Sequence, residues 1–423
     1  MSLRIDNARL LCPANGWDEN GSLLIEDGLI AEIGDIKGKA KDTIDAGGLC
    51  LSPGLIDLRV KTGEPGAEQK ETLATASRAA VAGGVTSMVV MPDTNPVIDD
   101  VALVQFIANR GQATAQTRIY PAGALTKGLN GEAMAEIGLM SDSGAVFFTN
   151  GDRPVADPSI LRRTMGYAAS CDAIVSSRAD DHSLAKNGVM NGGALAARIG
   201  LSGLPREAEW LGLSRDLLLA EATGCKLLID QVSTARSFEM IKAARDRGVK
   251  AWASVAAHHL FFNELDVGDY LTYCKVNPPF RKEEDRQALI EALAAGEIDA
   301  VVSAHDPQPP EEKRLPFAEA SFGAAGLETV LSALMVLVQD ERLSMLDALM
   351  PVTASPANII GVPQGQLNAG APADIILFDP NTPWLCEREH LRSRSLNSPF
   401  DGRRMVGRVM RTIIGGETVF ERD

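Results

Sequence analysis

The sequence predicts a parallel (β/α)8 barrel, the TIM-barrel class of α/β folds, joined to a small β-sandwich domain formed by both termini. Eight short apolar segments rich in β-branched residues cross the middle of the chain, and Ala/Leu/Glu-rich stretches separate most of them. Strands that alternate with helices indicate a parallel sheet covered on both faces. Eight such units over about 250 residues fit a closed barrel.

The eight strand candidates are residues 51–60, 84–92, 117–125, 144–151, 171–178, 225–232, 249–259 and 298–305. Helical periodicity is evident between them, for example over residues 70–84 and 235–249. The interval between 179 and 225 is longer than the others. It predicts an elaborated loop in addition to a helix.

The two ends of the chain predict strands without long helices. Residues 1–50 and 365–423 contain short apolar runs broken by Gly, Pro and Asp. Neither segment is long enough to be stable alone, so we expect the two to pair. The predicted domains are a composite sandwich over 1–52 and 356–423 and a barrel over 53–355.

Composition narrows the class of protein. A formal net charge of −15, with no Lys/Arg-rich run, argues against nucleic acid or an anionic membrane as the main partner. The six cysteines are scattered and form no C-x-x-C pair, which favours isolated buried thiols in a reducing compartment. The N-terminus does not have the pattern of a secretory leader, and no run of 18 apolar residues occurs. We therefore expect a cytoplasmic protein.

The ends of the predicted barrel strands are the candidate functional site. The sequence contains no phosphate-binding glycine loop and no G-x-S-x-G elbow, and TIM-barrel enzymes place their active sites at the carboxyl ends of the strands. The polar residues at these ends are Asp57, Arg59, Lys61, Asp93, Thr149, Asn150, Asp152, Arg178, Asp180, Asp230, Gln231, His258, His259, Ser303, His305 and Asp306.

Three of these residues are cations where a hydrolytic metal centre would need ligands. Strand alternation points Arg59 and Lys61 the same way, and Arg178 follows the fifth strand. Zinc is bound by neutral imidazoles, thiolates or carboxylates. A unit charge pair at 4 Å interacts by about 4 kcal/mol at an effective dielectric near 20, and a dication doubles this repulsion. The sequence therefore predicts no metal cofactor.

Each candidate also has an alternative interpretation. The three cations either form an anion site or pair with nearby carboxylates, the candidates being Asp57, Asp180, Asp230 and Asp306. Buried charges need such partners.

The histidines and one loop leave similar alternatives. His258 and His259 are either ligands or one packing histidine and one loop histidine. His305 is either catalytic or a hydrogen-bonded structural residue. The segment "KVNPPFR" (275–281) is either a tight turn or a former substrate loop.

From end to end, the chain resembles the dihydroorotases of the amidohydrolase superfamily, in the class related to hydantoinases and allantoinases. The segments that carry the resemblance are "SPGLIDLRVKTGEPG", "AAVAGGVTSMVVMPDTNPVID", "LPREAEW", "VSTARS", "HHLFF", "KVNPPFRKEEDRQAL", "GLETVL" and "SRSLNSPFDGRRMVGRVMRTIIGGE". The resemblance implies a barrel with a sandwich from both termini. It also implies zinc-dependent hydrolysis of a cyclic amide in de novo pyrimidine biosynthesis.

The chain departs from that family at every metal position that can be aligned. Where members carry D-x-H-x-H-x-R-E-P-G, this sequence has Arg59, Lys61 and Gly63. The S-D-D-G segment with the bridging aspartate is replaced by Thr149 and Asn150. Two further histidines are replaced by Arg178 and Gln231.

The catalytic base position is changed too. Ala304 stands where the family has its general-base aspartate, which leaves His305 and Asp306 as residual candidates. The substrate-binding positions that survive are Asn277, Arg281 and His305, and Asp93 stands where members often have an asparagine. We interpret these four as vestigial.

These replacements lead to one main hypothesis and two alternatives. The resemblance is greatest to inactive homologues that serve as structural partners of the aspartate transcarbamoylase catalytic chain, so we expect such a partner and a homo-oligomer. The first alternative is an active dihydroorotase or cyclic-amide hydrolase with an altered or absent metal site, in which His258, His259, His305 and Asp306 are the residual candidates. The second is an anion-sensing subunit that uses the three cations without reacting.

Overall fold

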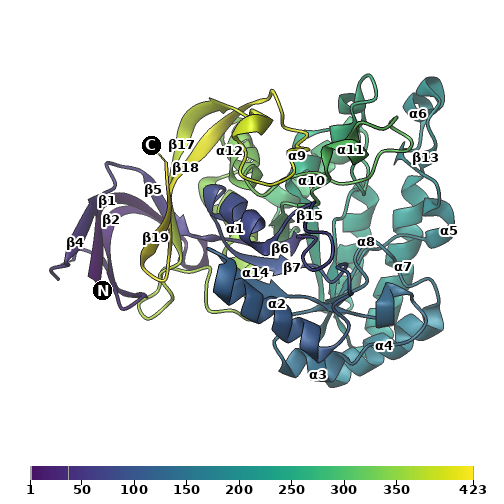
Figure 1. The fold of residues 1–423 in the computed structure, drawn as a ribbon, viewed down its shortest axis with the longest axis horizontal. Helices are drawn as coiled ribbons and strands as arrows, with labels where there is room; N and C mark the ends of the chain where they lie inside the picture. The colour runs from purple at the N-terminus through teal and green to yellow at the C-terminus, as the bar shows by residue number, and fades with distance from the viewer. Residues whose placement is uncertain (1, 37, 423) are drawn as a thin grey trace.

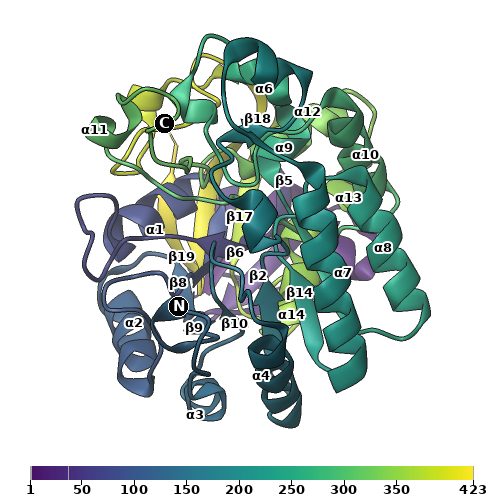
Figure 2. The same ribbon diagram turned by 90° about the vertical axis from the view of Figure 1, so that its right-hand side faces the viewer.

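The computed structural model of the protein describes residues 2–36 and 38–422, and within them eight parallel strands close into a barrel (Figures 1 and 2). The strands are β6 (Leu55–Val60), β7 (Val85–Val90), β8 (Arg118–Pro121) continued by β9 (Gly123–Ala124), β10 (Phe148–Thr149), β11 (Ile174–Ser177), β14 (Lys226–Ile229), β15 (Ala251–Ala256) and β16 (Ala300–Val302). Each lies inside one predicted segment. The predicted fold class is confirmed.

Two ladders of parallel pairs make up the barrel wall. One runs β6-β7-β8 and the other β9-β10-β11-β14-β15-β16. They join at Ala122, whose N–H donates to the Val90 carbonyl oxygen. The ring closes where Val60 forms a parallel bridge with His305 and the Lys61 N–H donates to the His305 carbonyl oxygen at 2.8 Å. The first and last strands therefore meet next to Lys61.

Helices surround this wall (Figure 2). They are α1 (Leu73–Ala82), α2 (Val101–Thr114), α3 (Ile137–Asp142), α4 (Pro158–Ser170), α5 (His182–Ala185), α6 (Ala194–Ile199), α7 (Arg206–Thr223), α8 (Ala235–Asp246), α9 (Ala257–Phe261), α10 (Glu283–Ala294), α11 (Pro310–Lys313), α12 (Val330–Gln339), α13 (Met345–Leu349) and α14 (Ala354–Ile360). The helices expected within 70–84 and 235–249 are α1 and α8. The long interval after residue 179 holds α5, α6, α7 and the short strands β12 (Met190–Asn191) and β13 (Gly203–Leu204), as predicted.

Local sequence explains where α1 and α2 begin. The Thr72 hydroxyl accepts a hydrogen bond from the Thr75 N–H at 3.0 Å, and the Thr75 hydroxyl accepts one from the Thr72 N–H at 2.9 Å. The Asp100 carboxylate accepts the Leu103 N–H at 2.9 Å. Both caps satisfy N–H groups that have no partner inside the first helical turn.

Both termini contribute to one eight-stranded sheet, as the sequence predicts. The strands are β1 (Ser2–Cys12), β2 (Trp17–Glu26), β3 (Leu29–Gly34), β4 (Asp42–Asp45), β5 (Cys50–Pro53), β17 (Ile375–Leu385), β18 (Arg404–Ile414) and β19 (Glu417–Glu421). In the described chain the order is β19-β18-β17-β5-β1-β2-β3, with β4 on β1. Strand β5 joins the two ends because it pairs with β1 on one side and β17 on the other.

The sheet encloses a core of its own beside the barrel (Figure 1). Leu10, Leu23, Leu51, Ile375 and Ile413 are fully buried there, in a cluster separate from the barrel core. The numerical domain boundaries at residues 52 and 356 stay a prediction.

Two expectations about the whole chain concern membranes and thiols. No helix in the described residues is long and apolar enough to cross a membrane. All six cysteines are free within that part of the chain, and Cys171 alone among them is partly exposed.

Candidate functional site at the barrel mouth

Asp152 is the centre of an ion-pair network at the carboxyl ends of the strands. It lies just after β10, and its Oδ1 is 2.5 Å from Arg59 Nη2 on β6 and 3.0 Å from Arg178 Nη1, just after β11. Its Oδ2 contacts the Lys61 ammonium. Burial opposes ionisation of Asp152, but the charges of Lys61, Arg59 and Arg178 hold its pKa well below the usual value.

The Lys61 ammonium lies among three carboxylates. Besides Asp152, its Nζ is 2.8 Å from Asp93 Oδ2 and 3.1 Å from Asp306 Oδ2. An ammonium group has three donors, and Lys61 uses two of them in hydrogen bonds to Asp152 and Asp306, while Asp93 forms an ion pair with it. Burial opposes the charged form, yet the three carboxylates raise the pKa of Lys61 well above its usual value.

The two arginines are held by further partners on neighbouring strands. Arg59 Nη1 is 3.1 Å from Asp230 Oδ2, and the Gln231 amide oxygen accepts from Arg59 Nε when the amide is placed in its hydrogen-bonded orientation. Arg178 Nη2 is 3.1 Å from Asp180 Oδ2 and donates to Asn277 Oδ1 at 2.6 Å. The side chains of Arg59 and Arg178 are only 5% and 2% exposed, which makes this pairing necessary.

The expected pairing of these cations is therefore confirmed for Asp180, Asp230 and Asp306 and is wrong for Asp57. The Asp57 carboxylate instead accepts the backbone N–H of Arg59 at 3.0 Å and that of Ser303 at 3.2 Å. Backbone N–H groups, and no cation, therefore supply the hydrogen bonds to the Asp57 carboxylate. Burial raises the pKa of Asp57 to about 6.

Thr149 and Asn150 hold the chain at the end of β10. The Thr149 hydroxyl accepts the Gly151 N–H at 3.1 Å. Asn150 Oδ1 accepts the N–H of Thr126 at 3.1 Å and its hydroxyl at 3.0 Å. Both side chains brace loops around the mouth.

His258 and His259 are both inside α9 and both buried, so the expectation of one loop histidine is wrong. Their rings are 4.8 Å apart and pack edge-on against Phe280. His259 Nε2 is 3.1 Å from the Pro278 carbonyl oxygen. Burial lowers the pKa of His258 well below its usual value and that of His259 to about 4, so both rings are neutral at pH 7. The apolar residues after them, Leu260 and Phe261, continue the helix.

His305 is a hydrogen-bonded structural residue, as one of the two interpretations predicted. Its Nδ1 accepts the Gly326 N–H at 3.2 Å, and its Nε2 is 3.5 Å from Glu71 Oε2. The Glu71 carboxylate also accepts the Ser393 hydroxyl and the Arg394 N–H. Nothing in the sequence around Glu71 signals its pairing with His305 and Ser393, because both are more than 200 residues away.

The positions interpreted as vestigial substrate contacts have structural partners. Arg281 Nε donates to the Ser233 hydroxyl at 3.0 Å, and its Nη1 donates to Asn191 Oδ1 at 3.1 Å. Asn277 accepts from Arg178, and Asp93 pairs with Lys61. Sequence reasoning missed the role of Asp152, although its position just after the fourth strand could have indicated it.

Two cavities open beside the network. One of about 310 Å³ is lined by Lys61, Lys70, Asp93, Asp152, Asp306, Gln308 and Phe322, among others. The other, of about 440 Å³, shares Asp152 and Phe322 and extends past Asp180 and Asn277. Both have the size of a small-molecule site. Three carboxylates and two lysines line the first cavity, and two of each line the second, so neither cavity has the excess of cations that an anion site needs.

The residues at the mouth do not fit the zinc that the family resemblance implies. Within residues 2–36 and 38–422, no three His, Cys, Asp or Glu side chains are grouped so that they could hold a metal ion. Asp93, Asp152 and Asp306 each direct an oxygen at the Lys61 ammonium. The lysine cation thus lies where these carboxylates would meet a metal.

Comparison with known proteins places this barrel and sandwich in a family. The model of the dihydro-orotase-like family matches residues 48–237. A protein named dihydroorotase from Syntrophotalea carbinolica is 40% identical to this chain, and the alignment covers 99% of each of the two sequences. A protein of the same name from Pelobacter propionicus is 39% identical, and the alignment covers 100% of each.

Solved structures agree on the architecture. An L-hydantoinase (dihydropyrimidinase) from Arthrobacter aurescens superimposes with a TM-score of 0.90 at 26% identity, covering 99% of this chain and 96% of its own. A D-hydantoinase, at 23% identity and a TM-score of 0.86, shares the fold. The chain belongs to the dihydroorotase-like family of amidohydrolases.

Proposed function

We propose that this protein is a non-catalytic member of its family that acts as a structural partner of the aspartate transcarbamoylase catalytic chain in pyrimidine biosynthesis. The observation that carries the non-catalytic half is the position of Lys61 Nζ among Asp93, Asp152 and Asp306. A covalently attached cation supplies the charge that holds these carboxylates together. Lys61 thus holds the strand ends of the mouth together but supplies no activated water for hydrolysis.

The chemistry of cyclic-amide hydrolysis supports this reading. The reaction needs an activated water, and a bound metal lowers the pKa of water from 15.7 to about 7. A positioned base typically contributes a further 10²–10⁴-fold. Ala304 carries no proton acceptor at the base position, and the neighbouring Asp306 directs Oδ2 at Lys61.

The partner half of the proposal rests on the family resemblance and on the outer surface of the barrel. Barrel and sandwich each have a buried apolar core, although ion pairs occupy the centre of the mouth. On α7, Leu211 and Leu218 are 55% and 59% exposed, and their spacing of seven residues places them on one helix face. Such a face suits contact with another protein.

Two measurements test the two halves separately. The purified protein should contain no stoichiometric zinc and should turn over neither dihydroorotate nor carbamoyl aspartate. Stoichiometric zinc together with turnover would overturn the non-catalytic half. Co-expressed aspartate transcarbamoylase should co-elute with this chain on gel filtration and lose activity or stability without it. Independent elution, with full transcarbamoylase activity alone, would overturn the partner half.

An active cyclic-amide hydrolase is the second candidate, because the relatives that match from end to end are named dihydroorotase. The residual groups for such an activity are Asp306 and His305. In that case Asp306→Asn should abolish turnover of dihydroorotate, while the surface change Asp18→Asn should leave it intact. A wild-type rate no higher than that of Asp306→Asn would remove this candidate.

A further inference from the structure

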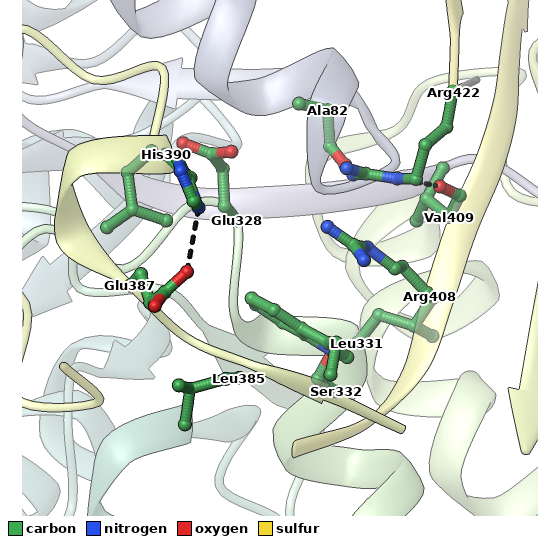
Figure 3. Close-up of a pocket in the computed structure, with 12 residues that line it drawn as sticks. Ala82, Glu328, Leu331, Ser332, Leu385, Glu387, His390, Arg408, Val409 and Arg422 are labelled. Atoms are coloured by element: carbon green, nitrogen blue, oxygen red, sulfur yellow. Dashed lines mark hydrogen bonds and ion pairs between the residues drawn. The ribbon is translucent and has the colours of Figure 1, made fainter. Parts of the chain in front are cut away.

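Three arginines from the C-terminal part of the chain converge on a small cavity between the sandwich and the barrel. Arg408 on β18 and Arg422 just after β19 line it, and Arg392 lies at its edge. The cavity has a volume of about 40 Å³ and is also lined by Glu328 and Trp384. We call it the arginine pocket. In Figure 3 the guanidinium groups of Arg408 and Arg422 lie close together, with Glu328, Glu387 and His390 on the opposite side.

The arginines of this pocket have no carboxylate partner. Arg422 Nε donates to the Val409 carbonyl oxygen at 2.9 Å, and the Arg408 guanidinium lies over the Trp384 ring at 5.2 Å. Arg408 Nε is buried and has no hydrogen-bond partner. Across residues 2–36 and 38–422, none of Arg392, Arg408 and Arg422 has a carboxylate oxygen within 4 Å. The side chains of Arg408 and Arg422 are half-buried, and a partly desolvated guanidinium without a counter-ion carries a free-energy penalty that a bound anion would reduce.

The electrostatics of the pocket leave a net positive charge. Burial, together with the neighbouring Arg408 and Arg392, lowers the pKa of Arg422 to about 10. The nearest carboxyl, Glu328, has its pKa raised to about 7 by burial, although it accepts the Arg392 N–H at 2.5 Å. Glu328 is therefore only partly ionised at neutral pH and does not neutralise the arginines.

We propose that the arginine pocket binds a small oxyanion, a carboxylate or a tetrahedral sulfate or phosphate group, through Arg408 and Arg422. The guanidinium fork matches the oxygen spacing of these anions. The volume exceeds what a single water needs, so the pocket accommodates a compact anion and excludes a large ligand. The site is separate from the barrel mouth and does not depend on the proposed function.

Binding at this site should weaken as pH rises through about 7. Deprotonation of Glu328 adds a negative charge beside the anion, and the affinity falls. The charged or titratable groups that face Glu328 are Arg392, Arg408, Arg422, Cys386, Glu387 and His390. His390 is 79% exposed and pairs with Glu387. A variant of Glu328 tests whether this glutamate causes the pH dependence.

Calorimetric titration with sulfate at pH 6 and constant ionic strength tests the site directly. We expect Arg408→Met to bind sulfate at least tenfold more weakly than the wild type, because a charge-assisted hydrogen bond is lost. Arg408→Lys keeps the charge but loses the two-pronged guanidinium, so its affinity for sulfate should lie between those of the wild type and Arg408→Met. It replaces Arg408→Met in the test if the methionine variant does not fold. Arg404→Met, an exposed arginine on the same strand, should bind as the wild type does.

A parallel titration with acetate distinguishes a carboxylate from a tetrahedral ligand, since the natural group should match the tighter probe. Equal binding of both probes by wild type and Arg408→Met would overturn the proposal, as would an equal loss in Arg404→Met. Wild-type affinity for sulfate should fall severalfold from pH 6 to pH 8, and Glu328→Gln should remove most of this fall. If Glu328→Gln retains the full fall, the assignment of Glu328 is wrong.

Discussion

The barrel mouth and the arginine pocket each gather three cations, but they satisfy them differently. At the mouth, Arg59, Lys61 and Arg178 share Asp152 and have further carboxylates on neighbouring strands. In the pocket, Arg408 and Arg422 lie near Glu328, which is only partly ionised at neutral pH, and Glu387 pairs with His390 instead. The supply of counter-ions, more than the presence of cations, decides whether a basic cluster is a closed structural element or a site open to a ligand.

The variant with the largest expected effect on stability removes Asp152, the carboxylate that the three cations of the mouth share. Asp152→Ala should lower the free energy of unfolding by about 3–5 kcal/mol, because it leaves Arg59 and Arg178 buried and facing one another. Urea denaturation of the purified variant measures the loss. Asp18→Ala is the matched control, since it breaks an ion pair with Arg9 whose partners are 40% and 37% exposed, and it should cost less than about 1 kcal/mol. Equal losses in the two variants would show that the mouth network is no more important than a surface pair.

A second test compares two carboxyls of the mouth that differ in their partners. Asp57 has no cation partner, and burial raises its folded pKa from the ordinary value of 3.8 to about 6. The folded state therefore binds an extra proton between pH 4 and 6, and this group makes stability fall by about 3 kcal/mol as pH rises through that window. Asp57→Asn should remove that part of the pH dependence, measured as unfolding free energy at pH 4, 5 and 6.

Asp152 should act with the opposite sign. Its cation partners hold its folded pKa well below the ordinary value, so its stabilisation is present above about pH 4 and is lost as pH falls further. Acid unfolding of the wild type should therefore begin below pH 4. If the unfolding free energy of Asp57→Asn depends on pH between 4 and 6 as that of the wild type does, the raised pKa of Asp57 is not the cause of that dependence.

The smallest expected effect is in the pocket. Arg408→Met removes a guanidinium that has no counter-ion and lies close to Arg422. We expect its unfolding free energy to change by less than about 1 kcal/mol, because relief of repulsion offsets the lost packing on Trp384. Thermal unfolding in anion-free buffer measures this. If Arg408→Met lowers the unfolding free energy as much as Asp152→Ala does, Arg408 has a structural partner. The pocket and the mouth would then not differ in how their cations are paired.

The sequence predicted the barrel and the paired termini because both depend on local pattern. Each strand is an apolar run a few residues long, and Arg59 and Lys61 are recognisable as cations at the end of one of them. The sequence places Asp152 at the end of the fourth strand, but barrel closure decides which strand ends meet, so its pairing with Arg59, Lys61 and Arg178 together depends on the closed barrel. His258 and His259 were misjudged because a strand end and a short buried helix share the same apolar sequence.

The arginine pocket has no local signature at all. Arg392, Arg408 and Arg422 come from a loop, a strand and the residue after the last strand, and 30 residues separate the first from the last. Pairing of β18 with β19 places Arg422 beside Val409 and so near Arg408, and the turn that leads into α12 brings Glu328 to the same cavity. A cluster of charges from separate segments is therefore recognised in the folded structure and not in the sequence.

Strand β5 has a consequence for synthesis of the chain. Pro53 pairs with Ile375, about 320 residues later, so one edge of β5 has no neighbour until nearly the whole polypeptide has left the ribosome. At about 5–20 residues per second, that edge stays open for roughly 15–65 s. An unpaired strand edge is a template for aggregation. Production of this protein should therefore depend more on chaperone capacity and translation speed than its mature stability suggests.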